Sequence, residues 1–374
     1  MKRYSKAKLA VAPPSWISLI AAGAIITGTS IIMETVRAEV ASNDTQLLKD
    51  ARRVFKPLPK DAATAQFPIT PERVELGRKL FFDPRLSVDG TVSCSRCHLS
   101  ALYATDGLPQ AKGVFDRLND RRAPTILNAA LHFQEHWRGD RENVEDQASR
   151  ALTGPASFGN PDNDVAIAKL KAIPGYPELF RQAFPGEPNP VTVENWGKAI
   201  GAFERTLLTP ARFDEYLAGN TQALSEPERQ GLRTFMETGC SGCHNGVVVG
   251  GGMFQKFGIV EEYWKETGSK HIDKGRFDVT HNPADMYVFK VPGLRNVAMV
   301  RPYFHDGSVG TLPEAVRIMA KVQLGKTLSP EDTSAIVSFL GSLTGKVPPN
   351  LAEAPVLPPA AFTPAPAEDV RPSK

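Results

Sequence analysis

Two segments of the chain place apolar residues at helical spacing behind a hydroxyl-bearing residue. Thr70 precedes residues 71–81 (PERVELGRKLF), and Ser225 shortly precedes residues 227–235 (PERQGLRTF). A hydroxyl at the N-cap accepts a hydrogen bond from the first turn, and acidic residues in that turn complement the helix dipole. The pattern therefore predicts two helices, and the likeness of the two segments indicates a weak internal repeat.

Little of the remaining pattern predicts β-structure. Glycine and proline, at 30 and 31 residues, interrupt most apolar runs. The length of 374 residues allows two ordinary domains with appendages, and 41% hydrophobic with 23% charged residues is usual for a soluble globular protein. The expected fold class is mainly α with long loops.

Both ends of the chain differ from this pattern. Lys2, Arg3 and two further lysines precede an apolar stretch over residues 16–33, and a small-residue cleavage pattern ends at Ala38. Residues 1–38 are predicted to be a bacterial export signal, with an uncleaved inner-membrane anchor as the alternative. At the other end, residues 347–374 are rich in proline and alanine and are expected to form a flexible tail.

Removing the leader changes the charge. Residues 1–38 carry five cations and one anion, so the net charge falls from +3 for the whole chain to about −1 without them. This balance gives no support for nucleic-acid binding.

All four cysteines lie in two copies of one motif, Cys94-Ser-Arg-Cys97-His98 and Cys240-Ser-Gly-Cys243-His244. Cys-x-x-Cys-His is the attachment signature of c-type haem, in which both thiols bind the porphyrin and the histidine binds the iron. A zinc site fits poorly, because it would need a second pair of ligands near each motif. Two covalent haems are therefore expected, and export agrees with haem attachment outside the cytoplasm.

The repeat and the motifs together indicate two cytochrome c-like domains, because such a domain begins with a helix over the haem edge followed by the motif. We expect an N-terminal domain over residues 39–210 and a C-terminal domain over residues 211–346, with the boundary near residues 209–220. Each haem would supply part of its domain's core.

Further segments carry a resemblance to a known family. They are residues 122–130 (RAPTILNAA), 136–140 (HWRGD), 145–148 (EDQA), 289–296 (FKVPGLRN) and 302–307 (PYFHDG). In this order around two haem motifs, the chain resembles the bacterial di-haem cytochrome c peroxidases and their relative MauG, from about residue 51 to residue 345. The resemblance implies two cytochrome c domains that face each other. A high-potential C-terminal haem would receive electrons, and a lower-potential N-terminal haem would meet hydrogen peroxide.

The second haem needs a sixth ligand that favours electron transfer. Histidine with methionine raises the potential of a haem. Met253 lies only nine residues beyond His244, whereas Met319 lies on an apolar helix face. The resemblance to the peroxidases implies Met319 as the ligand, whereas MauG-like proteins have tyrosine there. A core methionine is the alternative.

The first haem differs from the family pattern. Many relatives have a histidine after the first motif that blocks the peroxide site until the enzyme is half reduced. Residues 106–119 contain no histidine, and Val114 stands where it is expected. The first haem is therefore expected to be open or water-ligated when oxidised, with no need for reductive activation.

The expected catalytic acid is also absent. The resemblance places Gln147 in the peroxide pocket and a glutamate at the position of Ser157. A serine cannot act as a base near neutral pH, and losing a general base costs about 10²–10⁴ in rate. Either turnover is slow, or the base has moved, with Glu145 and Asp146 as candidates.

Two further residues are assigned through the resemblance. Relatives bind calcium between the domains with an asparagine where this chain has Arg122, and a threonine is common at the position of Val300. A guanidinium offers only donors, so calcium is doubtful, and Arg122 is expected to hydrogen-bond the vacated carbonyls. A solvated surface arginine is the alternative. Trp137 is expected to lie between the haems as an electron relay.

The leading functional prediction is a periplasmic peroxidase that reduces hydrogen peroxide with electrons from a small cytochrome c or a cupredoxin. One alternative is a MauG-like oxidase of a protein substrate, against which Met319 argues. The other is a di-haem electron-transfer cytochrome, for which Ser157 argues. A homodimer is expected only by analogy with the family.

Overall fold

The computed structural model describes residues 44–359. The predicted leader, residues 1–38, lies outside the described residues. The chain forms two compact units, Met1–Gln46 and Leu47–Lys374. Of the first unit only residues 44–46 are described, and they are helical. Of the second unit, residues 47–359 are described. None of the helices in the described part of the chain has the length and apolar character needed to cross a membrane.

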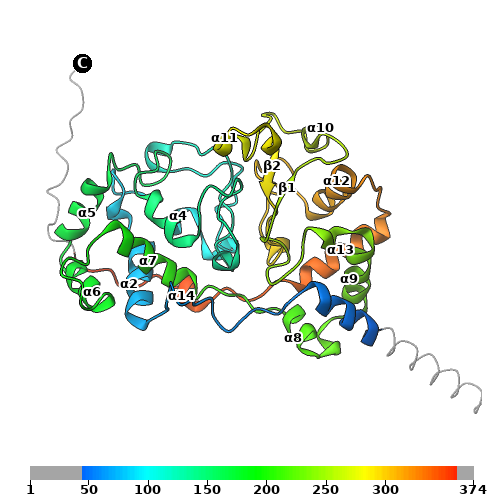
Figure 1. The fold of residues 1–374 in the computed structure, drawn as a ribbon, viewed down its shortest axis with the longest axis horizontal. Coiled ribbons are helices and arrows are strands. Elements are labelled where there is room, and N and C mark those ends of the chain that lie inside the picture. Colours follow the sequence, from blue (N-terminus) through cyan, green and yellow to red (C-terminus); the bar gives the residue numbers. More distant parts are fainter. Residues whose placement is uncertain (1–43, 360–374) are drawn as a thin grey trace, which may run out of the picture. The chain divides into compact units, whose positions relative to one another are not determined.

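The fold is mainly helical, which confirms the predicted class (Figure 1). Residues 47–54 are helical. The first half then contains α2 (Pro71–Phe82), α3 (Cys94–Cys97), α4 (Val144–Ala151), α5 (Asn163–Ala172), α6 (Tyr176–Ala183) and α7 (Val193–Glu204). The second half contains α8 (Arg212–Ala218), α9 (Glu226–Thr238), α10 (Tyr263–Thr267), α11 (Phe277–Thr280), α12 (Leu312–Leu324), α13 (Pro330–Ser342) and α14 (Pro349–Ala352). Two short antiparallel strands, β1 (Phe254–Lys256) and β2 (Val288–Lys290), form the sheet.

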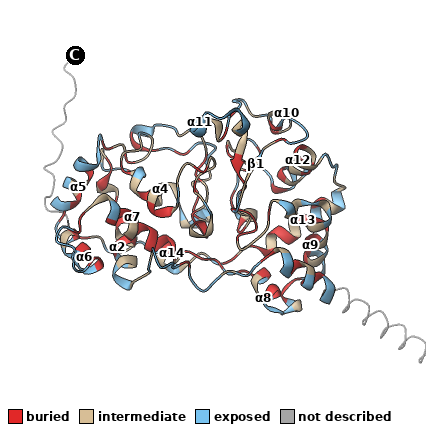
Figure 2. Cartoon of the chain, in the orientation of Figure 1, coloured by how far each residue is buried: buried red, intermediate tan, exposed pale blue. Residues whose placement is uncertain are grey.

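The two predicted helices occupy matching places in the two halves. The Thr70 hydroxyl accepts from the amide of Arg73 at the start of α2, and Ser225 forms a capping box with Glu228 at the start of α9. Helix α2 packs on α7, and α9 packs on α13. Figure 2 shows buried residues along α7 where these helices meet.

A glycine lets each helix pair approach closely. A Cβ on Gly77 of α2 would lie 1.9 Å from the carbonyl oxygen of Ala199, and one on Gly231 of α9 would lie 1.8 Å from that of Ala335. Both distances are far inside van der Waals contact, so any larger residue would force the helices apart. The repeated glycine of the sequence therefore marks the crossing point of a repeated helix pair.

Each half of the chain contributes a short segment to the buried apolar cluster of the other half. The largest cluster joins Leu47, Ala51 and Phe55 to residues of the second half such as Phe213 and Phe339. In return, Leu351 packs with Phe81 and other residues of the first half. The expected division between residues 210 and 211 therefore does not include these two crossing segments. Packing between segments that are distant in sequence produces no local sequence pattern.

The expectation of a flexible tail is wrong for residues 347–359. Helix α14 buries Leu351, whose side chain is 1% exposed. Arg78 of α2 donates to the carbonyls of Asn350 and Glu353 at 2.9 and 2.7 Å, and Lys79 donates to that of Val356 at 2.9 Å. Leu351 and Pro358 are buried, and the side-chain amide of Asn350 donates to the Thr206 hydroxyl at 2.9 Å. These contacts and the backbone acceptors hold the segment without giving a periodic apolar pattern. Residues 360–374 lie outside the described part.

Candidate functional site

The first cysteine motif lines one cavity, called here the first cavity. Cys94, Cys97 and His98 all lie in its wall. The Nδ1 of His98 lies 3.0 Å from the carbonyl oxygen of Ala104. Because a carbonyl only accepts, Nδ1 carries the proton, and Nε2 keeps its lone pair for a metal. Burial lowers the pKa of His98, which further favours the neutral ligand form.

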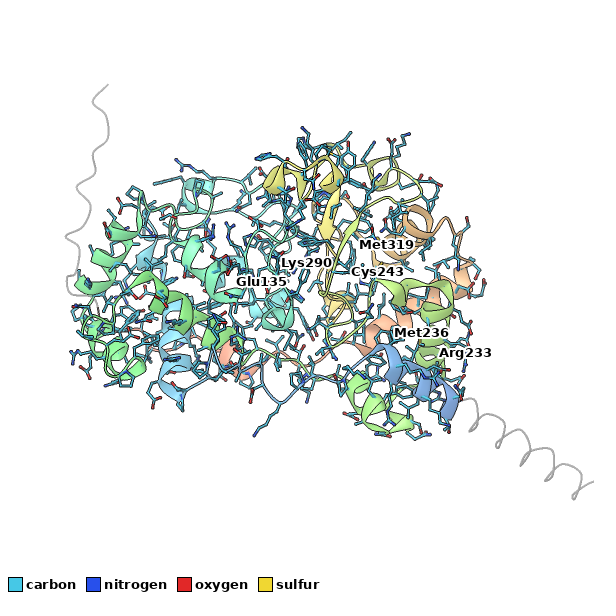
Figure 3. The ribbon with its side chains drawn as sticks, viewed as in Figure 1. Glu135, Arg233, Met236, Cys243, Lys290 and Met319 are labelled. Atoms are coloured by element: carbon cyan, nitrogen blue, oxygen red, sulfur yellow. The ribbon has the colours of Figure 1, made fainter. Side chains whose placement is uncertain are left out.

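The second motif lines a separate cavity, the second cavity. Cys240, Cys243 and His244 lie in its wall, together with Met319 of α12. Cys243 and Met319, both labelled in Figure 3, thus line the same cavity. His244 is buried, and burial lowers its pKa to about 4 against the opposite effect of the carbonyls of Val249 and Pro292. Its Nδ1 makes no hydrogen bond within the usual distance to a described residue.

Among Met253, Met286, Met299 and Met319, which follow the second motif and could supply a ligand, only Met319 lies in the described lining of the cavity that contains His244. Met253, Met286 and Met299 are not among the described residues that line the second cavity, and Met299 is 46% exposed. The two cavities also differ in polarity. The second is walled by apolar side chains, including Phe235, Phe257, Phe289, Leu294, Leu312, Val316 and Leu340. The first has many polar ones, including Asn119, Glu135, His136, Asp140, Gln147, Arg150, Ser157 and Glu204.

Trp137 lies in the wall of both cavities. Its indole Nε1 donates to the carbonyl of Arg122 at 3.1 Å, and its own carbonyl accepts from the amide of Lys290 in β2 at 2.9 Å. Main-chain contacts from both halves of the chain therefore fix the position of the indole. Trp137 therefore lies where the two cavities meet, and its role as an electron relay stays a prediction.

The residues predicted for a peroxide pocket come together in part. Gln147 and Ser157 both line the first cavity. The amide of Val114 donates to the carbonyl of Ser157 at 3.1 Å. Val114 is fully buried and is not among the described residues that line the cavity. The loop that lacks the blocking histidine thus packs against the segment that lacks the glutamate.

Neither Glu145 nor Asp146 replaces the missing acid. Arg205 binds both carboxylate oxygens of Glu145, at 2.6 and 2.9 Å, away from the cavity wall. Asp146 accepts from Arg150 at 2.7 Å and from the amide of Glu142 at 3.1 Å. The suggestion that one of them supplies the base is therefore wrong, because each is committed to a structural partner.

His136 is the ionisable residue that sequence reasoning passed over. It lines both cavities, and its Nδ1 lies 3.1 Å from Oδ1 of Asp140. Arg138 and Arg141 also contact Asp140, at 3.4 and 2.8 Å. Burial alone would raise the pKa of Asp140, but His136 and the two arginines hold it well below its ordinary value. The sequence pattern that could have indicated this pair is a histidine four residues before an aspartate. The pattern becomes informative only when the fold of the loop brings the two side chains into contact.

A buried ionic cluster also joins the halves. Glu135 lines the first cavity, and Lys290 and His132 line the second. The Nζ of Lys290 lies 2.9 Å from Nδ1 of His132 and 3.9 Å from Oε2 of Glu135 (Figure 3). Burial lowers the pKa of Lys290 against the opposing charge of Glu135. The cluster provides compensating charges where the walls of the cavities meet.

Arg122 is a buried residue, so the alternative of a solvated surface arginine is wrong. Its side chain is 5% exposed, and Nη1 donates to the carbonyl of Val300 at 3.2 Å. Its amide donates to the carbonyl of His305 at 3.0 Å. The neighbouring Arg121 instead pairs with Asp273, with two contacts of 2.6 Å. The expected hydrogen bond from Arg122 to a carbonyl of the opposite half is therefore present.

The residues around each cavity fit a haem group. Each cavity is lined by two unpaired thiols and a neutral histidine. The ring centroid of Phe81 lies 6.5 Å from that of His98, and the ring centroid of Phe235 lies 6.5 Å from that of His244. The same arrangement recurs in both halves of a mainly helical fold. These features fit a di-haem protein of the cytochrome c type.

Comparison with known proteins identifies the family. A family model described as di-haem cytochrome c peroxidase matches residues 71–222. The chain is 41% identical over 324 residues to a cytochrome c551 peroxidase of Pseudomonas aeruginosa, covering 85% of this chain and 92% of that relative. It is 34% identical over 304 residues to the methylamine utilization protein MauG of Methylorubrum extorquens, covering 81% and 82%.

A solved structure agrees. A MauG-like protein associated with microbial copper homeostasis matches with a TM-score of 0.70 and 28% identity, over 80% of this chain and 97% of that one. The chain belongs to the di-haem cytochrome c peroxidase family, as the sequence motifs predicted, and is an oxidoreductase of the peroxidase class. Family membership implies haem cofactors.

Proposed function

We propose that this protein carries two covalently attached haems and reduces hydrogen peroxide to water. Cys94 and Cys97 would bind the first haem, with His98 as the proximal ligand. Cys240 and Cys243 would bind the second, between His244 and Met319. Each turnover consumes one peroxide, two electrons and two protons and releases two waters.

The observation that carries this proposal is the inequality of the two cavities. Met319 lies in the same cavity as His244, within apolar walls, whereas no methionine is among the described residues lining the first cavity. A thioether ligand and apolar surroundings favour the ferrous state and suit electron entry, while a haem with an open sixth position can react with peroxide. Trp137, in the wall of both cavities, would shorten the path between the two groups.

We assign the proton transfer in the first cavity to His136, in place of the missing glutamate. Asp140 holds Nδ1 of His136, so Nε2 has a free lone pair and no hydrogen bond to a described residue. The neighbouring carboxyls are less suitable. The pKa of Asp140 is too low, and burial with the charges of Glu135 and Glu145 raises that of Glu204 well above its ordinary value. Gln147 and Ser157 would orient the peroxide by hydrogen bonds.

The first haem should accept peroxide without prior reduction. The segment 106–119 has no histidine, and Val114 is buried against Ser157. Optical and EPR spectra of the oxidised protein test this proposal: one high-spin haem and one low-spin haem are expected. Two low-spin haems would mean that a side chain, with His136 the first to examine, blocks the site.

Steady-state turnover of peroxide with reduced cytochrome c tests the activity itself. Turnover by the fully oxidised enzyme, without a lag, is the expected result. Absence of turnover by a protein that contains both haems would favour the electron-transfer cytochrome. Oxidation of a protein side chain without peroxide reduction would favour the MauG-like alternative, which is supported by relatives of that name.

We further propose that the protein works in the periplasm and receives electrons from a small cytochrome c or a cupredoxin. The cysteine motifs support export, because c-type haem is attached outside the cytoplasm. We also propose that calcium is not needed, since Arg122 already binds the carbonyl of Val300. Stoichiometric calcium in a metal analysis of the purified protein would contradict this, and size-exclusion chromatography would test a homodimer.

A further inference from the structure

The guanidinium of Arg122 is a buried cation, and two of its donor nitrogens are unused. Its side chain is 5% exposed, and Nη1 donates to the carbonyl of Val300 at 3.2 Å. Nε and Nη2 are buried and have no hydrogen-bond partner among the described residues. No ion pair connects Arg122 to a described carboxylate. A buried guanidinium with two unsatisfied donor atoms destabilises the fold unless an acceptor meets them.

The two unused nitrogens are the pair that binds carboxylates side-on elsewhere in this chain. Arg121 holds Asp273 through Nε and Nη2, both at 2.6 Å. Arg205 holds Glu145 through the same two nitrogens, at 2.6 and 2.9 Å. A planar guanidinium presents these donors as a fork that matches one carboxylate. The free edge of Arg122 is therefore shaped for a carboxylate. Asp106 is the described carboxylate whose charge acts on Arg122, but it makes no hydrogen bond or ion pair with the guanidinium, and its own Oδ2 is buried without a partner.

The guanidinium keeps its charge at neutral pH. Burial lowers the pKa of Arg122 to about 10, against the opposing influence of Asp106 and Tyr303. The residue lines both cavities, and the hydrogen bond from Nη1 places its charged end beside Val300 in the wall of the second cavity, where Tyr303 also lies. An occupant of the second cavity is therefore within reach of the charged end of Arg122 and can supply the carboxylate.

We propose that Nε and Nη2 of Arg122 bind a propionate carboxylate of the haem in the second cavity. This inference rests on the proposed occupancy of that cavity by haem, which carries two such groups. Arg122 would then be a positioning residue. Its guanidinium would bind the propionate and donates to the carbonyl of Val300. Its amide donates to the carbonyl of His305 at 3.0 Å, and its carbonyl accepts from the indole of Trp137 at 3.1 Å.

The charge has a consequence that can be measured. Reduction removes one positive charge from the haem iron, so a nearby fixed cation that neutralises the propionate favours the ferrous state. Replacing Arg122 with methionine should lower the midpoint potential of the second haem and leave that of the first in place. Arg122→Lys keeps the charge without the fork and should give a smaller shift.

The test is a spectroelectrochemical titration of the holoprotein, with haem content measured for every variant. Arg301→Met is the matched control, because Arg301 is an exposed cation next to Val300, and it should shift neither potential. Unchanged potentials in Arg122→Met with both haems bound would overturn the inference, as would a shift confined to the first haem.

Two further measurements keep the test decisive. If Arg122→Met does not accumulate, resonance Raman spectra of Arg122→Lys should show a changed propionate bending band of the second haem, and an unchanged band would overturn the inference. A free carboxylate from solution would instead make the wild-type potential depend on acetate concentration, and this result would also overturn it. Absence of peroxide turnover in the wild type, together with a lowered potential of the second haem in Arg122→Met, would count against the proposed function and not against this assignment.

Discussion

Asn128 and Asn296 donate their side-chain amides to the same hydroxyl, that of Thr209, at 2.8 and 2.9 Å. All three residues are buried. The two asparagines occupy matching segments, 124–131 (PTILNAAL) and 292–299 (PGLRNVAM), and both have left-handed backbone conformations, with φ of 63° and 62°. The two halves of the internal repeat thus converge on one residue at the expected domain boundary.

Replacing Thr209 with valine should destabilise the protein by about 2–5 kcal/mol. The substitution keeps the shape but leaves two buried amide donors without an acceptor, and each such group costs about 1–3 kcal/mol. Denaturation by urea, followed by a far-ultraviolet circular dichroism signal, measures the change. Thr209→Ser retains the acceptor and should lose much less. Equal stability of the valine variant and the wild type would show that water satisfies the amides.

Met319→Ala should open the second haem. Loss of the thioether removes the ligand that favours the ferrous state, so the midpoint potential falls and the ferric EPR signal of this haem changes from low-spin to high-spin. Met253→Ala is the control, since Met253 is not among the described residues lining the second cavity. If only the Met253 variant changes the spectrum, the assignment of the ligand is wrong.

His136→Gln should reduce kcat/KM for peroxide by about 10²–10⁴, the contribution of a general base. Glutamine keeps a polar side chain of similar size but cannot accept the proton. Ser157→Glu is the informative comparison and should change the rate little, because His136 already supplies the base. A large gain in Ser157→Glu together with an unchanged His136→Gln variant would mean that the wild-type site has no base.

The pair of Arg121 and Asp273 should make the protein sensitive to acid. Burial alone would raise the pKa of Asp273, but the hydrogen bonds and charge of Arg121 and the proximity of His305 hold it below its ordinary value of 3.8. A depressed pKa in the folded state adds stability above the unfolded-state value and loses it as the pH falls through the folded-state value. The stabilisation from this carboxyl is therefore present above about pH 4 and disappears below it.

Asp273→Asn tests this behaviour. The variant should be less stable by about 3–5 kcal/mol at pH 7, because the mostly buried Arg121 loses its close carboxylate and keeps only the more exposed Asp278, at 3.7 Å. Thermal unfolding between pH 2 and pH 7 should then show a gap between wild type and variant that narrows below pH 4. A constant gap across this range would show that Asp273 does not titrate with folding.

Leu351→Ala should cost about 2–5 kcal/mol of folding stability, although it lies in a proline-rich terminal segment. Its side chain is 1% exposed against the first-half cluster. Val356→Ala removes an 87% exposed side chain from the same segment and should be neutral. Chemical denaturation compares the two. Equal stabilities would mean that the segment does not complete the core.

Local chemistry accounts for what the sequence could predict. The caps at Thr70 and Ser225 and the cysteine motifs are contiguous patterns, and each was found where expected. The repeat was visible through Gly77 and Gly231 because close helix crossings exclude larger residues.

What the sequence could not predict depends on distant partners. Arg121 and Arg122 look alike in the chain, yet one pairs with Asp273 and the other is buried beside Val300. His136 gains its meaning from a loop conformation with a positive φ of 63° and from its contact with Asp140. Leu351 is a single apolar residue whose burial needs the first half already formed.

The exchange of chain between the halves imposes an order of assembly during synthesis. Residues 47–55 are made first, but their apolar partners lie in the second half, so this helix has no core to join until most of the chain exists. Residues 347–353 are made last, yet they complete the cluster of the first half. Neither half can finish folding before the whole chain has been translated, and any truncated product would expose apolar surface that marks it for proteolysis.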